Sequence, residues 1–369
     1  MTLSAPRPDN RFPQPAAATS PTTGPGSGSG SGSGTGSRSS SRSSSEVSIG
    51  FRERPLVVLS HPRSGTHLMI DGLRHFFRET KLRQKFNQPV HDLYINLDRL
   101  DDDHPYAASP EIFQRKFEQS PQRIIVKSHC GVEIDQVGLP YRDFASCVFS
   151  HADLVYVVRD VRPVLASYMA LRPLKFPDSP TDLQTFLRTE LDADMPPAAG
   201  WANHIRGWLE RDPRSKFMIR LDSASGTASA VPLAETEWAA SDGSDPAELP
   251  NSTSPEGAAV NTPSDAVSAP RLVIVRFEDM MKNYAGVVAA AGRAIGLTPT
   301  GEEIRIFPKP RSIRENKIRR IFGRQHSSSI DNLRMKMKTP DWKSSMTADD
   351  FALIRSEAGD VMHRLGYSI

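Results

Sequence analysis

The chain has 369 residues, of which 24% are charged, and its net charge at pH 7 is only +3. A charge this small gives no reason to expect a nucleic-acid partner, and no apolar run approaches the roughly 20 residues of a membrane span. The two cysteines, Cys130 and Cys147, are too few for a disulfide framework and fit a reducing compartment. We therefore expect a cytoplasmic protein, and the Ser- and Arg-containing N-terminus leaves organelle targeting open.

Two segments have compositions that disfavour a packed core. Residues 1–50 are rich in Gly, Ser and Pro, and the stretch at about 222–270 has eight acidic residues and no Lys or Arg. Neither has enough apolar surface to offset the entropy of ordering the chain. We predict a disordered tail over 1–50 and one domain over 51–369 that contains a low-complexity acidic insertion. About 270 residues then remain for a single sizeable core.

Continuous apolar runs predict four buried strands, at 56–60, 124–126, 154–158 and 272–275, with a fifth candidate at 217–221. None alternates polar with apolar residues, which is typical of strands buried on both faces of a parallel sheet. Helical spacing predicts helices at 66–77, 163–170, 202–209, 284–295 and 347–365, the last with Thr347 as N-cap. Strands that alternate with helices predict a three-layer α/β fold with a central, mostly parallel sheet flanked by helices.

The turn after the first strand resembles a phosphate-binding loop. It reads HPRSGT and leads directly into a helix, whose N-terminal N–H groups can bind an anion. Gly65 permits close backbone approach, Ser64 and Thr66 add hydroxyl donors, and Arg63 offers a planar fork for phosphate oxygens. The loop lacks the Gly-Lys-Ser/Thr signature of ATP and GTP hydrolases. Its alternative interpretation is an ordinary strand–turn–helix connection with a surface arginine.

The other predicted strands also end in polar residues. The second ends in Lys127-Ser128-His129, the third in Arg159-Asp160, and the fourth in RFED. Ligands bind outside the carboxyl ends of strands in such sheets, so we expect these ends to form one site. A lone histidine is more often structural, but the imidazole of His129 is suited to removing a proton from an attacking hydroxyl. Lys127 can hold the anionic group being transferred.

Three motifs together resemble the sulfotransferases that use 3′-phosphoadenosine-5′-phosphosulfate (PAPS). HPRSGTHLM is similar to the family's 5′-phosphosulfate loop, IVKSH to its catalytic-histidine strand, and YVVRDVRPVLASYM to its 3′-phosphate motif. VRFEDM and DWK, which is followed by Thr347, resemble two further family segments. The resemblance spans about 55–367 apart from the insertion. It implies a P-loop-type fold and a transfer of the sulfuryl group from PAPS to a hydroxyl, or amine, of a small organic acceptor.

The resemblance also implies roles for individual residues. The catalytic set is His129 as base, Lys127 at the sulfuryl group and Arg63 at the leaving phosphate. The nucleotide-binding set comprises Arg63, Ser64, Gly65, Thr66, His67, Arg159, Ser167, Arg334 and Lys336. Arg334 and Lys336 stand near the family's C-terminal Arg-Lys-Gly motif, which is not intact here. In-line transfer needs mainly positioning and charge stabilisation, so we expect fixed cations to suffice and no metal to be required.

Some positions depart from the family pattern. Arg63 stands where many cytosolic members have Lys, and arginine can neutralise a leaving phosphate but is a poor proton donor. Leu68 stands where those members stack adenine on Trp, and Ile313 replaces the facing aromatic residue. Weaker adenine stacking follows from these two replacements.

Two other functions compete with the sulfotransferase hypothesis. A P-loop kinase of a small molecule would share the fold, but its loop should carry Gly-Lys-Ser/Thr. A catalytically inactive nucleotide-binding protein would need neither Lys127 nor His129.

The basic run at 305–338 is either a solvated face or the edge of an anion site, and it lacks the interleaved aromatics of RNA-binding segments. The residues at 171–200, which include Phe176, Leu183, Phe186 and Leu187, suit the wall of a site for a small hydroxylated acceptor. The oligomeric state stays open, a homodimer included.

Overall fold

The computed structural model describes residues 50–80, 94–100, 110–134, 137, 141–172, 178–191, 195–233, 269–301 and 341–368. All of them belong to one compact unit, which spans Glu46–Ile369. Apart from Gly50, the predicted tail lies outside the described residues. So do the basic run at 305–338, with Arg334, Lys336 and Ile313, and residues 234–268 of the predicted insertion.

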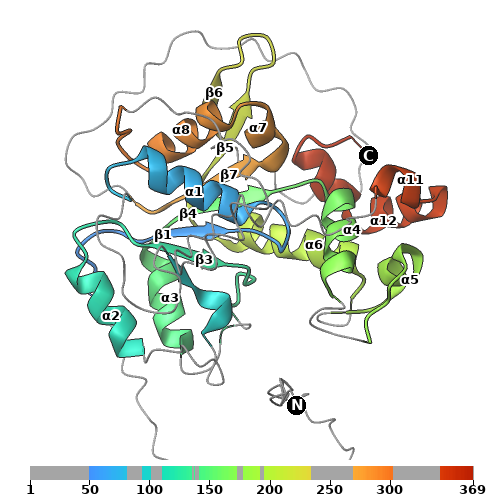
Figure 1. The fold of residues 1–369 in the computed structure, drawn as a ribbon, viewed down its shortest axis with the longest axis horizontal. Coiled ribbons are helices and arrows are strands. Elements are labelled where there is room, and N and C mark those ends of the chain that lie inside the picture. Colours follow the sequence, from blue (N-terminus) through green and yellow to red (C-terminus); the bar gives the residue numbers. More distant parts are fainter. Residues whose placement is uncertain are drawn as a thin grey trace, which may run out of the picture. The chain divides into compact units, whose positions relative to one another are not determined.

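A seven-stranded sheet forms the centre of the described part of the chain (Figure 1), in the order β2-β3-β1-β4-β7-β5-β6. The strands are β1 Leu56–Leu59, β2 Ile95–Asn96, β3 Ile125–Ser128, β4 Asp153–Val158, β5 Ser215–Leu221, β6 Ala228–Pro232 and β7 Arg271–Arg276. All neighbouring pairs are parallel except β5 and β6. The predicted α/β fold with a mostly parallel sheet is confirmed. The four predicted strands are adjacent at its centre, and the fifth candidate joins it as β5.

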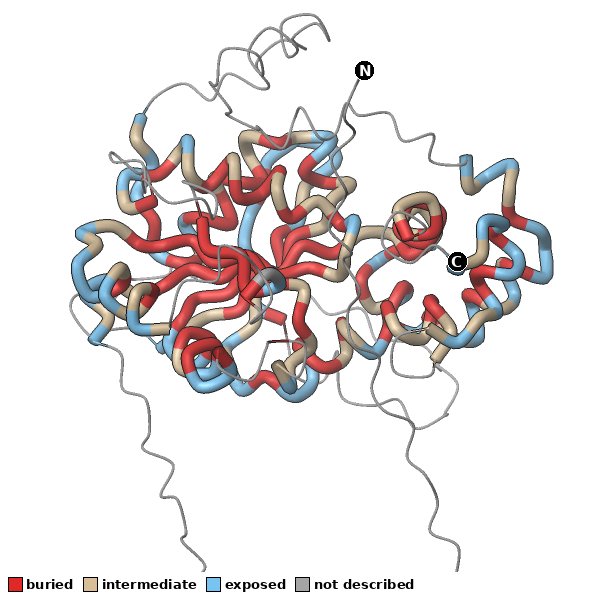
Figure 2. Tube along the Cα trace, turned by 60° about the horizontal axis from the view of Figure 1, so that its bottom comes forward, coloured by how far each residue is buried: buried red, intermediate tan, exposed pale blue. Residues whose placement is uncertain are grey.

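Helices cover both faces of this sheet. Along β1, Val57 and Leu59 pack into one apolar cluster while Leu56 and Val58 pack into another, because successive side chains of a strand point to opposite faces. The first cluster is closed by α2 Pro110–Gln119, α3 Arg142–His151, α4 Val161–Leu171, α5 Leu183–Arg188, α6 Pro197–Arg206 and α12 Ala348–Arg364. The second is closed by α1 Thr66–Phe76, α7 Phe277–Lys282 and α8 Tyr284–Ala294. Figure 2 shows the strands buried between these layers.

Three short elements complete the described structure. They are the 3₁₀ turn η1 Leu97–Arg99, the π-helical turn η5 Gly207–Arg211 and the helix α11 Trp342–Ser345. The predicted N-cap of the last helix is confirmed, because Thr347 and Asp350 form a reciprocal capping box at the start of α12. No helix within the described ranges has the length and apolar character needed to cross a membrane.

The start of the predicted insertion at 222–270 differs from expectation. Residues 222–233 form a hairpin rather than low-complexity chain, because β6 pairs antiparallel with β5. The turn is closed by Asp222, whose carboxylate accepts hydrogen bonds from the backbone N–H of Ala224 at 2.7 Å and of Ser225 at 3.2 Å. Such Asx turns, followed here by Gly226 at φ 68°, are a local hairpin signal that the biased composition obscured.

A buried ion cluster connects the N-terminal ends of neighbouring strands, opposite the carboxyl ends at which the site is predicted. Asp153, which is 2% exposed, begins β4 and accepts hydrogen bonds from Arg123 at 2.5 Å and from the backbone N–H of Arg271 at 2.9 Å. Arg123 in turn donates to the carbonyl oxygens of Arg54 at 2.8 Å and Ile295 at 3.0 Å. One guanidinium and one carboxylate thus fix the starts of three neighbouring strands.

We expect Asp153→Ala to lower the free energy of unfolding by about 3–5 kcal/mol, because it leaves the buried Arg123 guanidinium without a counter-charge. The matched control is Asp360→Ala, since the Asp360 side chain is 43% exposed and pairs with Arg206 on the surface. Removal of that pair should cost less than about 1 kcal/mol. Urea unfolding of both variants measures the difference, and equal losses would contradict the structural role of the cluster.

Candidate active site

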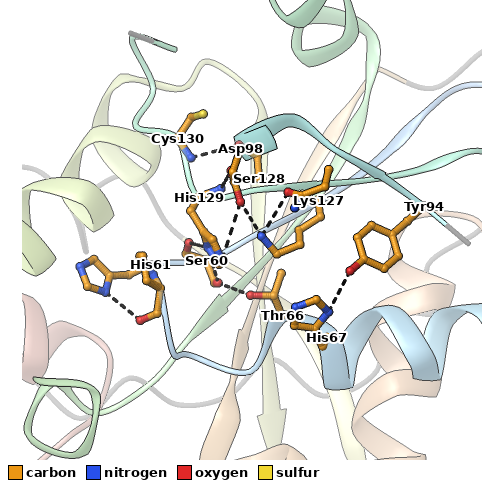
Figure 3. Close-up of polar contacts among 12 residues, drawn as sticks. Ser60, His61, Thr66, His67, Tyr94, Asp98, Lys127, Ser128, His129 and Cys130 are labelled. Atoms are coloured by element: carbon orange, nitrogen blue, oxygen red, sulfur yellow. Dashed lines mark hydrogen bonds and ion pairs between the residues drawn. The ribbon is translucent and has the colours of Figure 1, made fainter. Parts of the chain in front are cut away.

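The loop between β1 and α1 has a backbone that few sequences can adopt. Both Arg63, at φ 73°, and Gly65, at φ 107°, lie in the left-handed region. A Cβ at position 65 would stand 2.5 Å from Cδ2 of Phe277, so the close approach of the loop to α7 requires glycine there. At the base of the loop the hydroxyls of Ser60 and Thr66 are hydrogen-bonded to each other (Figure 3).

The structure brings the predicted 5′-phosphate loop and the predicted 3′-phosphate motif together. Arg63 donates from Nε to the hydroxyl of Ser167 on α4 at 2.8 Å. Arg159, which follows β4, donates from Nη1 to the carbonyl oxygen of Arg63 at 3.1 Å. The Arg159 guanidinium also lies 4.4 Å from the centre of the Phe277 ring. The guanidinium of Arg159 and the hydroxyl of Ser167 therefore lie against the loop that carries Arg63.

Several donors around this loop have no partner in the described part of the chain. The Oγ of Ser64 and the Nε of Arg159 are buried and make no hydrogen bond. Burial lowers the pKa of Arg63, and it lowers the pKa of Arg159 despite the opposing charge of Glu278. Buried donors without acceptors and desolvated positive charges are both unfavourable unless an anion completes them. The loop therefore fits a phosphate or sulfate group.

A hydrogen bond connects the residues that follow β4 with those that follow β7. Glu278 accepts from the backbone N–H of Asp160 at 3.2 Å and from the hydroxyl of Tyr367 at 2.8 Å. Asp160 also forms an ion pair with Arg162 at 2.6 Å, and the Arg162 guanidinium lies 4.8 Å from the centre of the Trp342 ring. The sequence segments RFEDM and DWK, noted separately, are thus docked on the residues that follow β4.

Lys127 lies on β3 and His129 directly follows the last residue of this strand, and the side chain of Lys127 points toward Asp98 (Figure 3). Its ammonium group donates to Oδ1 of Asn96 at 3.3 Å and is paired with the carboxylate of Asp98. The residue is only 4% exposed. Asn96 and Asp98 lie on β2 and η1 and were missed by sequence reasoning. The alternation of Ile95, Asn96, Leu97 and Asp98 was the available signal for a strand edge with two polar side chains on one face.

Hydrogen bonding sets the tautomer of His129. Its Nδ1 lies 2.6 Å from the carbonyl oxygen of Ser60, which can only accept, so Nδ1 carries the proton. In the neutral ring Nε2 then keeps its lone pair. Burial and the charge of Lys127 lower the pKa of His129 to about 3, although Asp98 and the Ser60 carbonyl oppose this shift. The imidazole is therefore neutral at pH 7, with Nε2 able to accept a proton.

Two further histidines lie beside His129. His204 on α6 donates from Nε2 to the carbonyl oxygen of His129 at 3.0 Å, and its Nδ1 accepts from the hydroxyl of Tyr156 at 2.6 Å. The ring of His61 meets His204 edge-on, with 5.8 Å between their centres, and meets Tyr168 at 6.0 Å. Burial, reinforced by His204, lowers the pKa of His61 to about 3, and burial also lowers the pKa of His204. All three rings are neutral at pH 7.

Not every predicted site residue joins this cluster. His67 on α1 contacts the hydroxyl of Tyr94 through Nδ1 at 3.2 Å. Leu68, expected beside the adenine, is 2% exposed and packs in the core. The expected acceptor wall is wrong for three apolar residues of α5, which the structure buries in the core: Leu183, Phe186 and Leu187. Periodicity could not separate a pocket wall from a core face. Phe176, Arg334 and Lys336 lie outside the described residues.

The described residues include no group of three or more His, Cys, Asp or Glu side chains that could hold a metal ion. The site is instead positively charged at the loop, through Arg63 and Arg159, while Lys127 on β3 is paired with Asp98 and the three histidines are neutral at pH 7. Its residues can bind anionic groups and accept a proton.

The three histidines predict a loss of stability in mild acid. Their pKa values are lowered in the folded state, so below about pH 6.5 the unfolded chain binds protons that the folded chain does not. Stability is then complete above the unfolded pKa and falls as the pH drops toward about 3 for His61 and His129. We expect His204→Gln to make the fall in stability between pH 6 and 5 shallower, because it removes one of the three histidines whose pKa is lowered by folding.

Urea unfolding at pH 7, 6 and 5 measures this slope. His363→Gln, which removes an exposed histidine on α12, is the control and should leave the slope unchanged. An unaltered slope in His204→Gln would show that His204 is not kept neutral by its surroundings.

A family model and a curated protein similar to this chain both carry the name sulfotransferase. The family model described as "Sulfotransferase domain" matches residues 53–220. Sulfotransferase 2A2 of Rattus norvegicus is 25% identical over 170 residues, which are 46% of this chain and 52% of that protein. The chain thus spans about half the length of the curated relative it matches.

Two solved structures are also similar, each over most of its length. A mouse sulfotransferase, SULT7A1, complexed with PAP, has a TM-score of 0.36 and 13% identity over 87% of this chain and 88% of its own. A retinol dehydratase in a complex with retinol and PAP has a TM-score of 0.40 and 14% identity over 87% of this chain and 84% of its own. At these scores they add nothing to the fold described above. The residues that match the sulfotransferase domain model contain both the anion-binding loop and the segment Lys127–His129.

Proposed function

We propose that the protein is a PAPS-dependent sulfotransferase, which moves a sulfuryl group to a hydroxyl, or amine, of a small organic acceptor. The observation that carries this proposal is the junction of Arg63, Ser167 and Arg159, with the 2.8 Å hydrogen bond at its centre. It unites a phosphate-binding loop with a second cationic position, as a nucleotide with two separate phosphate groups requires. We assign residues 51–369 to one sulfotransferase domain.

The residues of the loop would hold the nucleotide. Arg63, Ser64, Gly65 and Thr66 surround a place for the 5′-phosphosulfate, where the free Ser64 hydroxyl gains an acceptor. Arg159 and Ser167 would bind the 3′-phosphate. His67 remains a proposed further contact, and its Nδ1 is hydrogen-bonded to the hydroxyl of Tyr94. Arg334 and Lys336 remain proposed contacts from the C-terminal side.

In the proposed reaction the protein compensates negative charge and accepts one proton. PAPS supplies the sulfuryl group and leaves as adenosine 3′,5′-bisphosphate (PAP) when its sulfate–phosphate bond breaks and the acceptor–sulfur bond forms. His129 takes the proton of the acceptor hydroxyl on Nε2, Lys127 compensates the charge of the sulfuryl oxygens, and Arg63 compensates the charge that grows on the leaving phosphate. The neutral state of His129 at pH 7 allows it to act as the base without prior deprotonation.

The neutral imidazole of His129 also indicates the class of acceptor. A neutral imidazole is suited to a hydroxyl that must lose its proton during attack, and His61 and Tyr168 lie close by at the end of β1 and on α4. These amphipathic rings suit a small hydroxylated molecule, which we propose as the acceptor class. A screen in which only sulfated polysaccharides were modified would contradict it.

Calorimetric binding of PAP tests the function directly. We expect PAP to bind more tightly than 5′-AMP and than ATP with magnesium, because only PAP carries a 3′-phosphate. Arg159→Ala should weaken PAP binding about 10- to 100-fold, the usual effect of losing charged hydrogen bonds, and should leave 5′-AMP binding unchanged. The control Arg206→Ala removes a surface arginine that pairs with Asp360 and should have no effect.

Preference for ATP with magnesium would replace the proposal by a small-molecule kinase. Binding of none of the three nucleotides would favour a protein that has kept the fold without the activity.

Gly65→Ala tests the geometry of the loop. The new Cβ would stand 2.5 Å from Phe277, so either the loop or the ring under Arg159 must move, and we expect PAP affinity to fall more than about tenfold. Gly226→Ala is the matched control, because it also places alanine at a positive φ, of 68°, but with nothing within 4 Å of the new Cβ. It should cost about 1 kcal/mol of stability and no affinity. Equal affinities in the two variants would contradict the role of Gly65.

A further inference from the structure

The carboxylate of Asp98 lies between the two side chains assigned to the transfer. Asp98 belongs to η1, which follows the edge strand β2, and its side chain is 22% exposed (Figure 3). Its Oδ1 accepts from the backbone N–H of His129 at 2.6 Å and from the hydroxyl of Ser128 at 3.4 Å. Its Oδ2 is paired with the ammonium of Lys127 and lies 3.9 Å from Nε2 of His129. One side chain thus touches three consecutive residues.

These contacts hold the geometry of β3 where the strand ends. Residues two apart on a strand point to the same face, so Lys127 and His129 need a partner that spans both. The backbone N–H of His129 is past the last residue of β3 and has no strand partner there. Asp98 provides the missing acceptor and at the same time fixes the long, flexible side chain of Lys127.

Charge gives Asp98 a second effect. The titratable groups that face His129 in the described chain are Lys127 on β3, Asp98 on η1, His204 on α6 and His61 on the loop. Lys127 and His204 lower the pKa of His129, and Asp98 is the one charged side chain that raises it. Burial alone would raise the pKa of Asp98, but the nearby His129 and Lys127 outweigh burial and lower it, so the carboxylate stays ionised.

We propose that Asp98 is a positioning residue of the transfer reaction, which aligns Lys127 with His129 and supplies the negative charge that stabilises the imidazolium formed when Nε2 takes the acceptor's proton. The inference rests on the proposed function. It adds no chemical step, since the proton stays on His129 and Asp98 remains a carboxylate. A carboxylate 3.9 Å from Nε2 offsets the neighbouring ammonium, which would otherwise oppose proton transfer to the ring.

A first experiment tests the Lys127–Asp98 ion pair by chemical labelling and does not depend on an activity assay. Full-length protein and its Asp98→Asn variant are treated with limiting acetic anhydride, and acetylation of each lysine is measured by peptide mass spectrometry. Loss of the carboxylate removes the ion pair that favours the protonated ammonium, so Lys127 becomes more nucleophilic. We expect Lys127 to react about tenfold faster, while the reference lysines Lys282 and Lys343 react as before. An unchanged Lys127 rate, or a general rise at every lysine, would overturn the pairing.

A second experiment separates positioning from folding. With PAPS and phenol as a probe acceptor, whose hydroxyl keeps its proton at pH 7, Asp98→Asn should lower kcat about 10- to 100-fold while KM for PAPS and the affinity for PAP stay within about twofold. The acid limb of the kcat–pH profile should move to lower pH, because the base loses the charge that raises its pKa. Asp98→Glu restores the charge and should recover part of kcat and the slow labelling of Lys127.

The control is Asp360→Asn, a neutralised carboxylate on the surface of α12, which should match the wild type in all readouts. Parallel losses of kcat, PAP affinity and melting temperature in Asp98→Asn would mean that Asp98 is structural only. If the wild type binds no PAP, the proposed function fails, and the labelling of Lys127 still decides whether the ion pair exists.

Discussion

The parallel pairing of β3, β1, β4 and β7 is the constraint on which the candidate site depends. The register places the last residue of β1 opposite the last residue of β3, so Ser60 and His129, which follow them, lie side by side and form the 2.6 Å hydrogen bond that sets the tautomer. β4 extends two residues beyond β1. Arg159 therefore reaches across the loop to the carbonyl of Arg63, and Phe277, just after β7, lies under its guanidinium. Backbone register alone thus assembles residues that are far apart in the sequence.

Charge at this sheet edge is balanced by side chains that are not themselves assigned to the reaction. Asp98 compensates Lys127 on one side, and Glu278 faces Arg159 on the other. The carboxylates are held by hydrogen bonds to backbone N–H groups, at His129 and Asp160. Arg63 differs, since its recorded side-chain partner is the neutral hydroxyl of Ser167. In the described part of the chain, Arg63 thus has a neutral hydrogen-bond partner rather than a carboxylate, at the loop where the 5′-phosphosulfate is proposed to bind.

The parts of the fold that could be predicted are those where composition and geometry give the same signal. The four central strands are buried on both faces, so their apolar runs are unbroken and their place together in one mostly parallel sheet could be predicted. β2 has only two residues and a polar face, which made its signal too short, and Asp98 was missed with it. β6 lay in a segment whose overall composition indicated low complexity, although the Asx turn at Asp222 is local. Leu183 and Phe186 had the composition of a pocket wall, but only tertiary packing could show them to be core.

The same arrangement explains why the site is costly to the free protein. Buried donors such as the Ser64 hydroxyl and Arg159 Nε have lost their hydration without gaining an acceptor, which opposes folding. The three histidines limit this cost, because their neutral forms add no further positive charge beside the loop. An anion that binds the folded chain alone returns the missing acceptors and adds RT ln(1 + [L]/Kd) to its stability. The hydrogen bonds that these buried donors do not make in the free protein can therefore be made to a bound anion and contribute to its binding free energy. The sheet holds the donors in position before the anion binds.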